Sequence, residues 1–383
     1  MNRNLLALVV AQFLSAFSDN AILFVVVAIV LKAGNPAAWY IPALQSVFLV
    51  AFVACAPWVG PAADRFPKPQ VLMAANALKA TGTLLILAGL EPLIAYAVVG
   101  VGAALYSPAK YGILPELVAK DDLVRANSVV EGATIAAILI GTLAGAKLAD
   151  HSVPQALALT AGLYVLSAVA GLALPRLEAR GARLDVALGQ LAARIRTVFA
   201  SARARLVVLS LSLFWAAAAT LRIVLVAWAP LVLQTRNAGD IAELTLFLAI
   251  GIVIGSVAAP RFITLDSIRR ARIPAYGLSL SFLLLADVEG IWAARAVLLA
   301  IGTAGGLFVV PLNAAMQHIG HQTIGSGGAV AMQNLFQNLT MLGAVSGYTL
   351  ASAHGVGPVG AIYTLGGLML AATISVSLRL PKA

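Results

Sequence analysis

Cysteine and charged residues are both scarce in this chain of 383 residues. The single cysteine, Cys55, excludes a disulfide bond within the chain and a cluster of thiolates around a metal. Charged residues make up only 10% of the sequence, whereas a soluble domain has about 25%. Hydrophobic residues make up 61%, so the composition excludes an ordinary soluble domain and indicates an all-α membrane protein with several spans.

Sequence signatures of catalysis are missing as well. The chain contains no H-E-x-x-H, no G-x-x-x-x-G-K-[ST] and no G-x-S-x-G, which are the patterns of zinc proteases, P-loop proteins and serine hydrolases. His318 and His321 fall in a predicted turn without carboxylate or thiol neighbours, so we expect no metal site there. We therefore expect a chain that is not an enzyme, has no cofactor and does not itself drive transport with ATP.

About twelve apolar runs are long enough to cross a bilayer, since a spanning helix needs about 20 residues. The first run carries a charge near its middle and is too long for the core of a signal peptide, so we expect it to be retained as a span. The predicted limits are 5–31, 39–62, 71–90, 92–114, 126–149, 155–175, 206–234, 241–262, 273–288, 291–314, 327–350 and 357–379.

Lysines and arginines gather in alternate connections between these runs. Positive charge close to the ends of spans is held on the cytoplasmic side of a membrane, so we expect both termini to be cytoplasmic. The net charge of +10 then reflects topology and contact with anionic lipid head groups. It gives no reason to expect a nucleic-acid partner.

One long connection separates six predicted spans from the other six. We therefore expect an N-terminal six-helix bundle over 1–175, a cytoplasmic linker over 176–205 and a C-terminal six-helix bundle over 206–383. Apolar residues recur in the linker at helical spacing beside arginines, which predicts a basic amphipathic helix on the membrane surface. These apolar residues are Leu184, Leu188, Leu191, Ile195 and Phe199.

An internal repeat relates the two halves. Two six-helix halves in the same orientation imply a pseudo-twofold axis along the membrane normal and a substrate site at their interface near the midplane. The paired glycines of the repeat are expected to support close helix packing. A shift of 202 positions superposes Asp64 on Asp266, Lys68 on Arg270, Glu131 on Gln333, Gly141 on Gly343 and Gly145 on Gly347.

A shift of 203 positions superposes Asp19 in the first span on Arg222 in the seventh. We expect these opposite charges to face each other across a central cavity. A charge at the centre of a spanning helix costs about 2.5–3.5 kcal/mol on insertion scales, so it needs a compensating reason. A structural ion pair is the alternative to a substrate site, but hydrocarbon often replaces a buried pair without loss of stability, and a role in binding is therefore favoured.

Further polar side chains accompany these charges. Gln12 and Ser15 share a helical face with Asp19. Lys110 follows Pro108, which can bend the helix, and snorkelling of Lys110 to the interface is the alternative to a binding role. Lys79 has no matching partner in the sequence, and its role stays open. The candidate substrate-binding residues are Gln12, Asp19, Asn20, Lys110, Asn127, Glu131, Arg222, Gln333 and Gln337.

The segment Gly60-x3-Asp64-Arg65-x2-Lys68 resembles the loop motif of the major facilitator superfamily, although prolines at 67 and 69 depart from its usual basic run. The fifth run resembles part of the glycine motif of that superfamily, with Ala146 in place of its proline. This resemblance implies a major facilitator fold of twelve transmembrane helices in two six-helix bundles, with a monomer as the default. The residues expected to gate its conformational change are Asp64, Arg65, Lys68, Asp266 and Arg270.

Four stretches spread over both halves resemble the bacterial lysophospholipid transporters. They are AQFLSAFSDNA, VGVGAALYSPAKYGILPEL, SLFWAAAATLR and GGLFVVPLNAAMQ. The resemblance covers essentially the entire chain and implies a protein of the bacterial inner membrane. It implies transport of lysophosphatidylethanolamine and related lysolipids, such as lysophosphatidylglycerol, from the outer to the inner leaflet. There an acyltransferase/acyl-carrier-protein synthetase restores the second acyl chain.

The charged residues suit the two ends of such a head group. We expect Arg222, assisted by Lys110, to meet the phosphate, because a guanidinium can present two donors to it. Asp19 or Glu131 would receive the ammonium. The alternative function is a proton-coupled transporter of another amphiphilic or drug-like substrate, in which the two carboxylates titrate.

Overall fold

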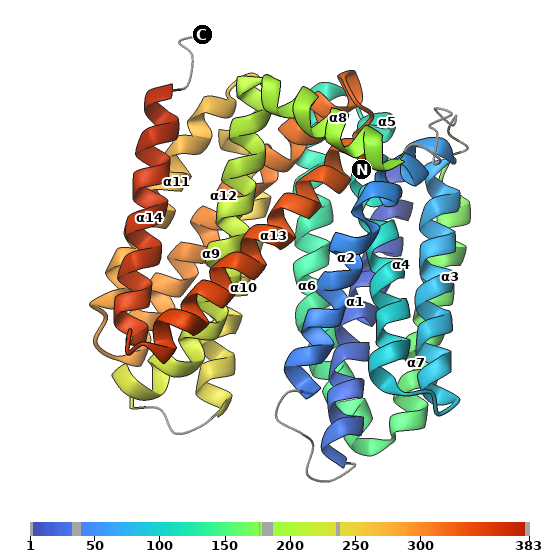
Figure 1. Cartoon of the computed structure of the whole chain (residues 1–383), viewed down its shortest axis with the longest axis horizontal. Helices are drawn as coiled ribbons and strands as arrows, with labels where there is room; N and C mark the ends of the chain where they lie inside the picture. Colours follow the sequence, from blue (N-terminus) through green and yellow to red (C-terminus); the bar gives the residue numbers. More distant parts are fainter. Residues whose placement is uncertain (1–2, 33–39, 176, 178–186, 235–237, 380–383) are drawn as a thin grey trace. The chain divides into compact units, whose positions relative to one another are not determined.

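The structure is a computed structural model that describes residues 3–32, 40–175, 177, 187–234 and 238–379. These residues form helices joined by short connections, and no strand occurs among them (Figure 1). The predicted all-α class is therefore confirmed. The long helices of the first half are α1 (Arg3–Lys32), α2 (Tyr40–Arg65), α3 (Lys68–Leu87), α4 (Pro92–Gly112), α6 (Leu123–His151) and α7 (Val153–Ala170).

The second half repeats this series of long helices. They are α9 (Ala202–Val232), α10 (Ala238–Phe262), α11 (Arg272–Ala286), α12 (Ile291–Gln322), α13 (Ser326–Ala353) and α14 (Pro358–Arg379). Short elements lie between the long ones: α5 (Leu114–Leu117), η1 (Lys120–Asp122), η2 (Gly171–Ala173), α8 (Ala187–Ala200) and η3 (Ile268–Ala271).

Ten helices within the described ranges are long and apolar enough to cross a membrane. Two of the long helices are not among them, for different physical reasons. Helix α11 has only 15 residues, which is shorter than the roughly 20 that a span needs. Helix α13 has 28 residues, but it contains four amide side chains whose polarity lowers its hydropathy: Gln333, Asn334, Gln337 and Asn338.

The predicted helix limits agree with the structure to within a few residues except at the end of α12. This helix continues to Gln322, beyond the predicted end at 314. His318 and His321 therefore lie in a helix, and their prediction as turn residues is wrong. The predicted end lies where the apolar run ends. The helix continues beyond it because Ala314, Ala315 and Met316 have high helix propensity, although the residues that follow them are polar.

The predicted linker contains a helix, α8, from Ala187 to Ala200, and its place on the membrane surface stays a prediction. Leu191, Ile195 and Phe199 are half-buried, whereas Arg196 is exposed, as expected for an amphipathic helix. Leu184 lies outside the described residues.

The chain divides into two compact units. Unit 1 comprises Met1–Lys120, Ala133–Thr197 and Gln317–Leu335. Unit 2 comprises Asp121–Gly132, Val198–Met316 and Phe336–Ala383. The end of α12 and the start of α13 thus belong to unit 1, and the start of α6 belongs to unit 2. The bundle limits of 1–175 and 206–383 stay a prediction.

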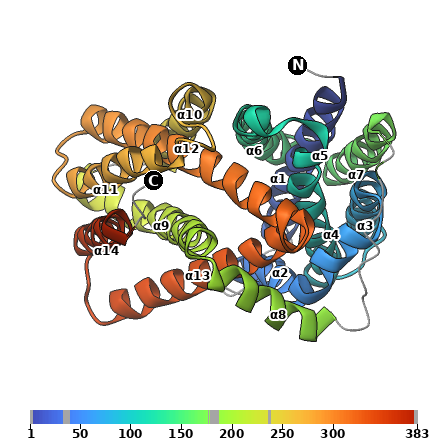
Figure 2. The same cartoon turned by 90° about the horizontal axis from the view of Figure 1, so that it is seen from above.

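In unit 1, helix α3 packs against α4 and α7, and α1 packs against α7 (Figure 2). Their apolar core includes Ile22, Val25, Tyr96 and Tyr164. Glycines on α6 bring it against α1, because a Cβ on Gly145 would lie 2.6 Å from the carbonyl oxygen of Ala21. The expected packing role is confirmed for Gly141 and Gly145.

In unit 2, helix α14 packs against α11 and α9 (Figure 2). Helices α10 and α12 approach closely through glycine, since a Cβ on Gly302 would lie 2.8 Å from the amide nitrogen of Ile252. The predicted packing glycines of α13 behave differently. Within the described part of the chain, a Cβ on Gly343 or Gly347 would meet no atom within 4 Å, so their expected role in close packing is wrong.

Candidate functional site

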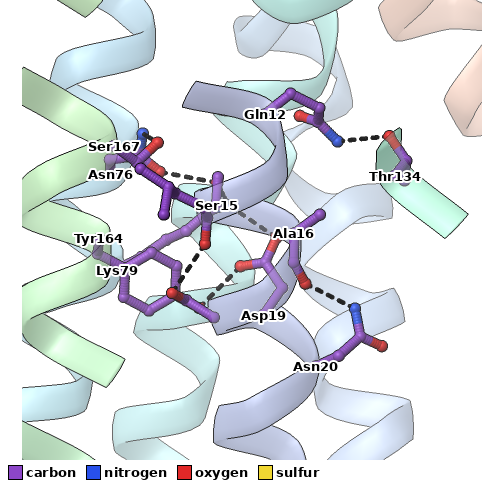
Figure 3. Close-up of polar contacts among 12 residues, drawn as sticks. Gln12, Ser15, Ala16, Asp19, Asn20, Asn76, Lys79, Thr134, Tyr164 and Ser167 are labelled. Atoms are coloured by element: carbon purple, nitrogen blue, oxygen red, sulfur yellow. Dashed lines mark hydrogen bonds and ion pairs between the residues drawn. The ribbon is translucent and has the colours of Figure 1, made fainter. Parts of the chain in front are cut away.

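The central feature of unit 1 is a buried ion pair between α1 and α3 (Figure 3). Lys79 Nζ lies 2.9 Å from Asp19 Oδ2. The side chain of Lys79 is 0% exposed and that of Asp19 is 23% exposed. Tyr164 on α7 donates its hydroxyl to Asp19 Oδ1 over 2.8 Å. Each carboxylate oxygen of Asp19 therefore accepts one strong hydrogen bond from inside the unit.

A chain of neutral polar groups extends from the ion pair through the same three helices. Lys79 Nζ also donates to Ser15 Oγ over 2.9 Å. Ser15 in turn donates to Asn76 Oδ1 over 2.9 Å, and the Asn76 amide donates to Ser167 Oγ over 2.8 Å. Ser167 donates to the backbone carbonyl of Ala11 over 2.6 Å. The network satisfies these buried polar groups, which stabilises a single arrangement of α1, α3 and α7.

Aromatic rings complete the surroundings of the lysine. Lys79 Nζ lies 4.5 Å from the ring centroid of Tyr106 and 5.5 Å from that of Tyr164. Both distances allow a cation–π contact, which is stronger where water is excluded. The ammonium of Lys79 thus has an anion, a hydroxyl and two rings around it, and this explains how a fully buried cation is accommodated.

Helical spacing places these side chains on facing surfaces. Ser15 and Asp19 are four residues apart on α1, and Asn76 and Lys79 are three apart on α3, so each pair lies on one face of its helix. Gly102 on α4 leaves the room that the lysine needs. A Cβ at Gly102 would lie 2.7 Å from Lys79 Cγ and 2.8 Å from the carbonyl oxygen of Ala75.

The partner of Asp19 in the structure is Lys79, for which no sequence pattern indicated a partner. A separation of 60 positions in the sequence hides the pairing from any local pattern. The polar spacing Asn76-x2-Lys79 inside an apolar run was the available signal. A direct contact between Asp19 and Arg222 stays a prediction. Arg222 lies on α9, is exposed, and forms no ion pair among the residues that the structure describes.

Gln12 and Asn20 accompany Asp19 on α1 but point to other partners (Figure 3). Gln12 is buried, and its amide donates to Thr134 Oγ1 on α6 over 2.9 Å. Asn20 is half-buried and donates to the carbonyl of Ala16 in its own helix over 2.8 Å. Neither is bonded to the Asp19 carboxylate, so of the expected face only Ser15 joins its network.

The other candidate binding residues lie on α4, α6 and α13. Lys110 is buried near the end of α4, with Nζ 4.0 Å from the ring centroid of Tyr111. On α6, Asn127 is buried and donates to the carbonyl of Leu123 over 2.9 Å, and Glu131 is buried one turn later. Gln333 and Gln337 are buried on α13. That these side chains line one cavity with Asp19 stays a prediction.

The expected gating residue Asp64 lies at the end of α2 and caps the start of α13. Its Oδ1 accepts from the amide of Gly327 over 3.1 Å and its Oδ2 accepts from the amide of Gly328 over 3.0 Å. The first amides of a helix lack partners within it, and the helix dipole favours an anion there. Asp64 is 3% exposed. A Cβ on Gly327 would lie 2.9 Å from Asp64 Oδ1, so glycine makes this contact possible.

Two cations accompany the Asp64 cap. Lys68 on α3 is buried and forms an ion pair of 2.6 Å with Glu116 on α5. Arg194 on α8 lies beside the cap: burial lowers the pKa of its guanidinium and the charge of Asp64 raises it. A guanidinium stays protonated in proteins, so Arg194 is a cation beside the cap.

The remaining expected gating residues differ from Asp64 and Lys68 in their surroundings. Arg65 is exposed, with its guanidinium 5.7 Å from the ring centroid of Phe66. Asp266 and Arg270 are both exposed in the connection between α10 and α11. The repeated loop motif therefore differs between the two halves at two positions: Asp64 and Lys68 are buried, whereas their counterparts Asp266 and Arg270 are exposed.

Comparison with known proteins identifies the fold and the family. The sequence profile of the Major Facilitator Superfamily matches residues 8–344. The chain is 42% identical over 379 residues to a lysophospholipid transporter LplT of Photorhabdus laumondii, covering 98% of this chain and 95% of that protein. It is 41% identical over 362 residues to a lysophospholipid transporter LplT of Klebsiella pneumoniae, covering 94% and 91%.

Solved structures with low sequence identity share the fold. The human organic anion transporter MFSD10 superposes with a TM-score of 0.79 at 17% identity, covering 98% of this chain and 99% of that one. The fucose:proton symporter FucP of E. coli superposes with a TM-score of 0.78 at 14% identity, covering 99% and 98%. The predicted superfamily fold is confirmed. The chain belongs to the Major Facilitator Superfamily and, within it, to the family of the lysophospholipid transporters LplT.

Proposed function

We propose that this chain moves lysophospholipids across a membrane by alternating access. The observation that carries the proposal is the match over almost the whole chain to proteins named lysophospholipid transporters. The substrate would be lysophosphatidylethanolamine and related lysolipids, taken from the outer to the inner leaflet of the bacterial inner membrane. The positive charge near predicted cytoplasmic connections supports two cytoplasmic termini. An acyltransferase/acyl-carrier-protein synthetase would use the product, and the transporter would act as a monomer.

The geometry of Asp19 supports a role for its carboxylate in receiving the ammonium of an ethanolamine head group. A carboxylate offers about four acceptor positions, and the hydrogen bonds described above come from Lys79 and Tyr164. Lys79 is fully buried while Asp19 is partly exposed, so a ligand can approach the carboxylate without displacing the lysine. Lys79 and Tyr164 then act as positioning residues that fix Asp19.

Arg222 is the proposed partner of the phosphate, assisted by Lys110. Arg222 is exposed on α9 and forms no ion pair in the described part of the chain, so its fork of donors is available to an oxyanion. The repeat symmetry of the sequence supports a shared site for Asp19 and Arg222 near the midplane. Asn127, Glu131, Gln333 and Gln337 would supply its polar lining.

Asp64 supports the alternating-access part of the proposal. Its two hydrogen bonds join the end of α2 to the start of α13, and helices from different sequence halves must separate and rejoin during a transport cycle. We assign the Asp64 cap as a latch that holds one state. Lys68 would brace it through Glu116, and Arg65, Asp266 and Arg270 would act at the surface.

Leaflet-resolved uptake of lysophosphatidylethanolamine into proteoliposomes tests the function. Arg222→Ala is expected to abolish uptake while leaving membrane insertion intact. Arg261→Ala is the matched control, because Arg261 is also exposed in unit 2, near the end of α10. Normal uptake by Arg222→Ala would contradict the phosphate assignment. Uptake that follows an imposed proton gradient would instead indicate the proton-coupled transporter.

A further inference from the structure

Unit 2 contains a cavity of about 630 Å³ whose lining includes none of the proposed head-group residues. It lies among the first turns of α9 and α11, the middle of α12 and the last turns of α14. Its volume falls within the roughly 300–1,000 Å³ of ligand pockets. The walls are mostly hydrocarbon, contributed by Leu206, Leu213, Leu278, Leu312, Met369 and Val376.

Charged side chains of the cavity gather at one end of it. Arg203 lies at the start of α9, Arg269 in η3 and Arg272 at the start of α11. Asp266 is the single carboxylate among the lining residues. Three guanidiniums against one carboxylate give this end an excess of positive charge. Arg269 and Arg272 form no ion pair among the described residues, so their donors are available to a ligand.

The length of the cavity matches one leaflet of a bilayer. Its lining on α9 runs from Arg203 to Leu213, which is about 15 Å at 1.5 Å per residue. The hydrocarbon core of a bilayer is about 30 Å thick. One leaflet is half of this thickness. A ligand that fills the cavity therefore needs an anionic end and an apolar part about 15 Å long.

The corresponding loop of unit 1 uses two of its charged side chains in buried contacts. Asp64 is used in the helix cap and Lys68 in a buried ion pair. Their repeat counterparts Asp266 and Arg270 are exposed. At these two positions the loop of unit 2 exposes the charges that the loop of unit 1 buries.

We propose that this cavity binds an anionic phospholipid of the bilayer, with its phosphate on Arg269 and Arg272 and one acyl chain along the apolar wall. The excess of positive charge favours a lipid with net negative charge over a zwitterionic one. The inference goes beyond the transport proposal, because the ligand is a bound membrane lipid and not the transported molecule. The positive-inside distribution predicts that this end faces the cytoplasmic leaflet.

Native mass spectrometry of the full-length protein with added phosphatidylglycerol or phosphatidylcholine tests the proposal. The unsubstituted protein is expected to retain phosphatidylglycerol in preference to phosphatidylcholine. Arg269→Gln combined with Arg272→Gln is expected to weaken phosphatidylglycerol binding about 30-fold, taking each basic contact as roughly fivefold. Arg261→Gln, outside the cavity lining, is the control and is expected to leave binding unchanged.

A second pair of variants tests the apolar part. Ala372→Phe on α14 adds a ring to the cavity lining, whereas Ala371→Phe alters its exposed neighbour outside the lining. The first is expected to reduce retention of phosphatidylglycerol and the second to leave it unchanged. Equal retention of the two lipids, or full retention by the double arginine variant, would overturn the proposal. Displacement by equimolar lysophosphatidylethanolamine would also overturn it, because the occupant would then be the transported lipid.

Discussion

Separate removal of the two charges of the Asp19–Lys79 pair tests the network on which the candidate site depends. Asp19→Asn leaves the Lys79 ammonium with a 0% exposed side chain. Lys79→Met leaves the Asp19 carboxylate with 23% of its side chain exposed and with its hydrogen bond from Tyr164. Each variant therefore leaves one unpaired charge, and the two charges differ in their exposure to water.

Breaking a buried ion pair by removing one partner costs about 3–5 kcal/mol. We expect Asp19→Asn to lie at the upper end of this range, because water does not reach the lysine that remains. Lys79→Met is expected at the lower end, at about 3 kcal/mol, since the carboxylate keeps one donor and partial hydration. The double variant removes both charges and is expected to be more stable than either single variant, because hydrocarbon often replaces a buried pair at little cost.

The assay is the free energy of unfolding in mixed micelles, followed by circular dichroism as denaturing detergent is titrated. Lys120→Met, at an exposed position in η1, is the control and is expected within about 0.5 kcal/mol of the unsubstituted protein. Costs below about 1 kcal/mol for both single variants would refute the reasoning, since hydrogen bonds within membranes average about 0.6 kcal/mol. Uptake measurements on the double variant separate stability from binding. A stable double variant that still transports normally would show that Asp19 does not receive the head group.

Three further substitutions probe the surroundings of the site by the same titration. Tyr164→Phe removes a hydrogen bond to Asp19 and is expected to cost about 1.5–3 kcal/mol, while Tyr276→Phe on α11 should cost almost nothing. Gly102→Ala forces a Cβ against Lys79 and is expected to lower the free energy of unfolding by about 1–3 kcal/mol. Its control is Gly132→Ala, whose Cβ would meet no described atom within 4 Å. This variant is expected to raise the free energy of unfolding by up to about 1 kcal/mol. Asp64→Asn keeps one acceptor for the start of α13 and is expected to cost about 1–2 kcal/mol, with exposed Asp121→Asn unchanged. A cost for Gly132→Ala equal to that for Gly102→Ala, or none for Tyr164→Phe or Asp64→Asn, would contradict these assignments.

The helices could be predicted from the sequence because hydrocarbon must continue for the whole width of a bilayer. That rule locates α1 or α7 to within a few residues, but it says nothing of the polar end of α12, where helix propensity alone extends the chain. The site was predicted in part. A carboxylate at Asp19 is conspicuous among apolar residues, whereas its bond to Lys79 depends on how α1 and α3 pack. The internal repeat indicated Arg222 because Arg222 occupies the position in the second half that Asp19 occupies in the first. Such a comparison between halves cannot reveal a contact between two helices of the same half, as between Asp19 and Lys79.

The finding that Asp19 is paired within its own unit changes what the intramembrane charges imply about head-group recognition. Asp19 and Lys79 largely neutralise each other, and the shift that relates Asp19 to Arg222 places Phe282 at the position equivalent to Lys79. In the second half, the residue equivalent to Lys79 is therefore uncharged and does not pair with Arg222. In the proposed site, Lys79, Lys110 and Arg222 would outnumber the carboxylates Asp19 and Glu131 by one positive charge. A phosphate removes this excess, whereas an ammonium adds to it. The phosphate should therefore dominate recognition, and the contact of an ethanolamine ammonium with Asp19 should add only a smaller preference over an uncharged glycerol head group.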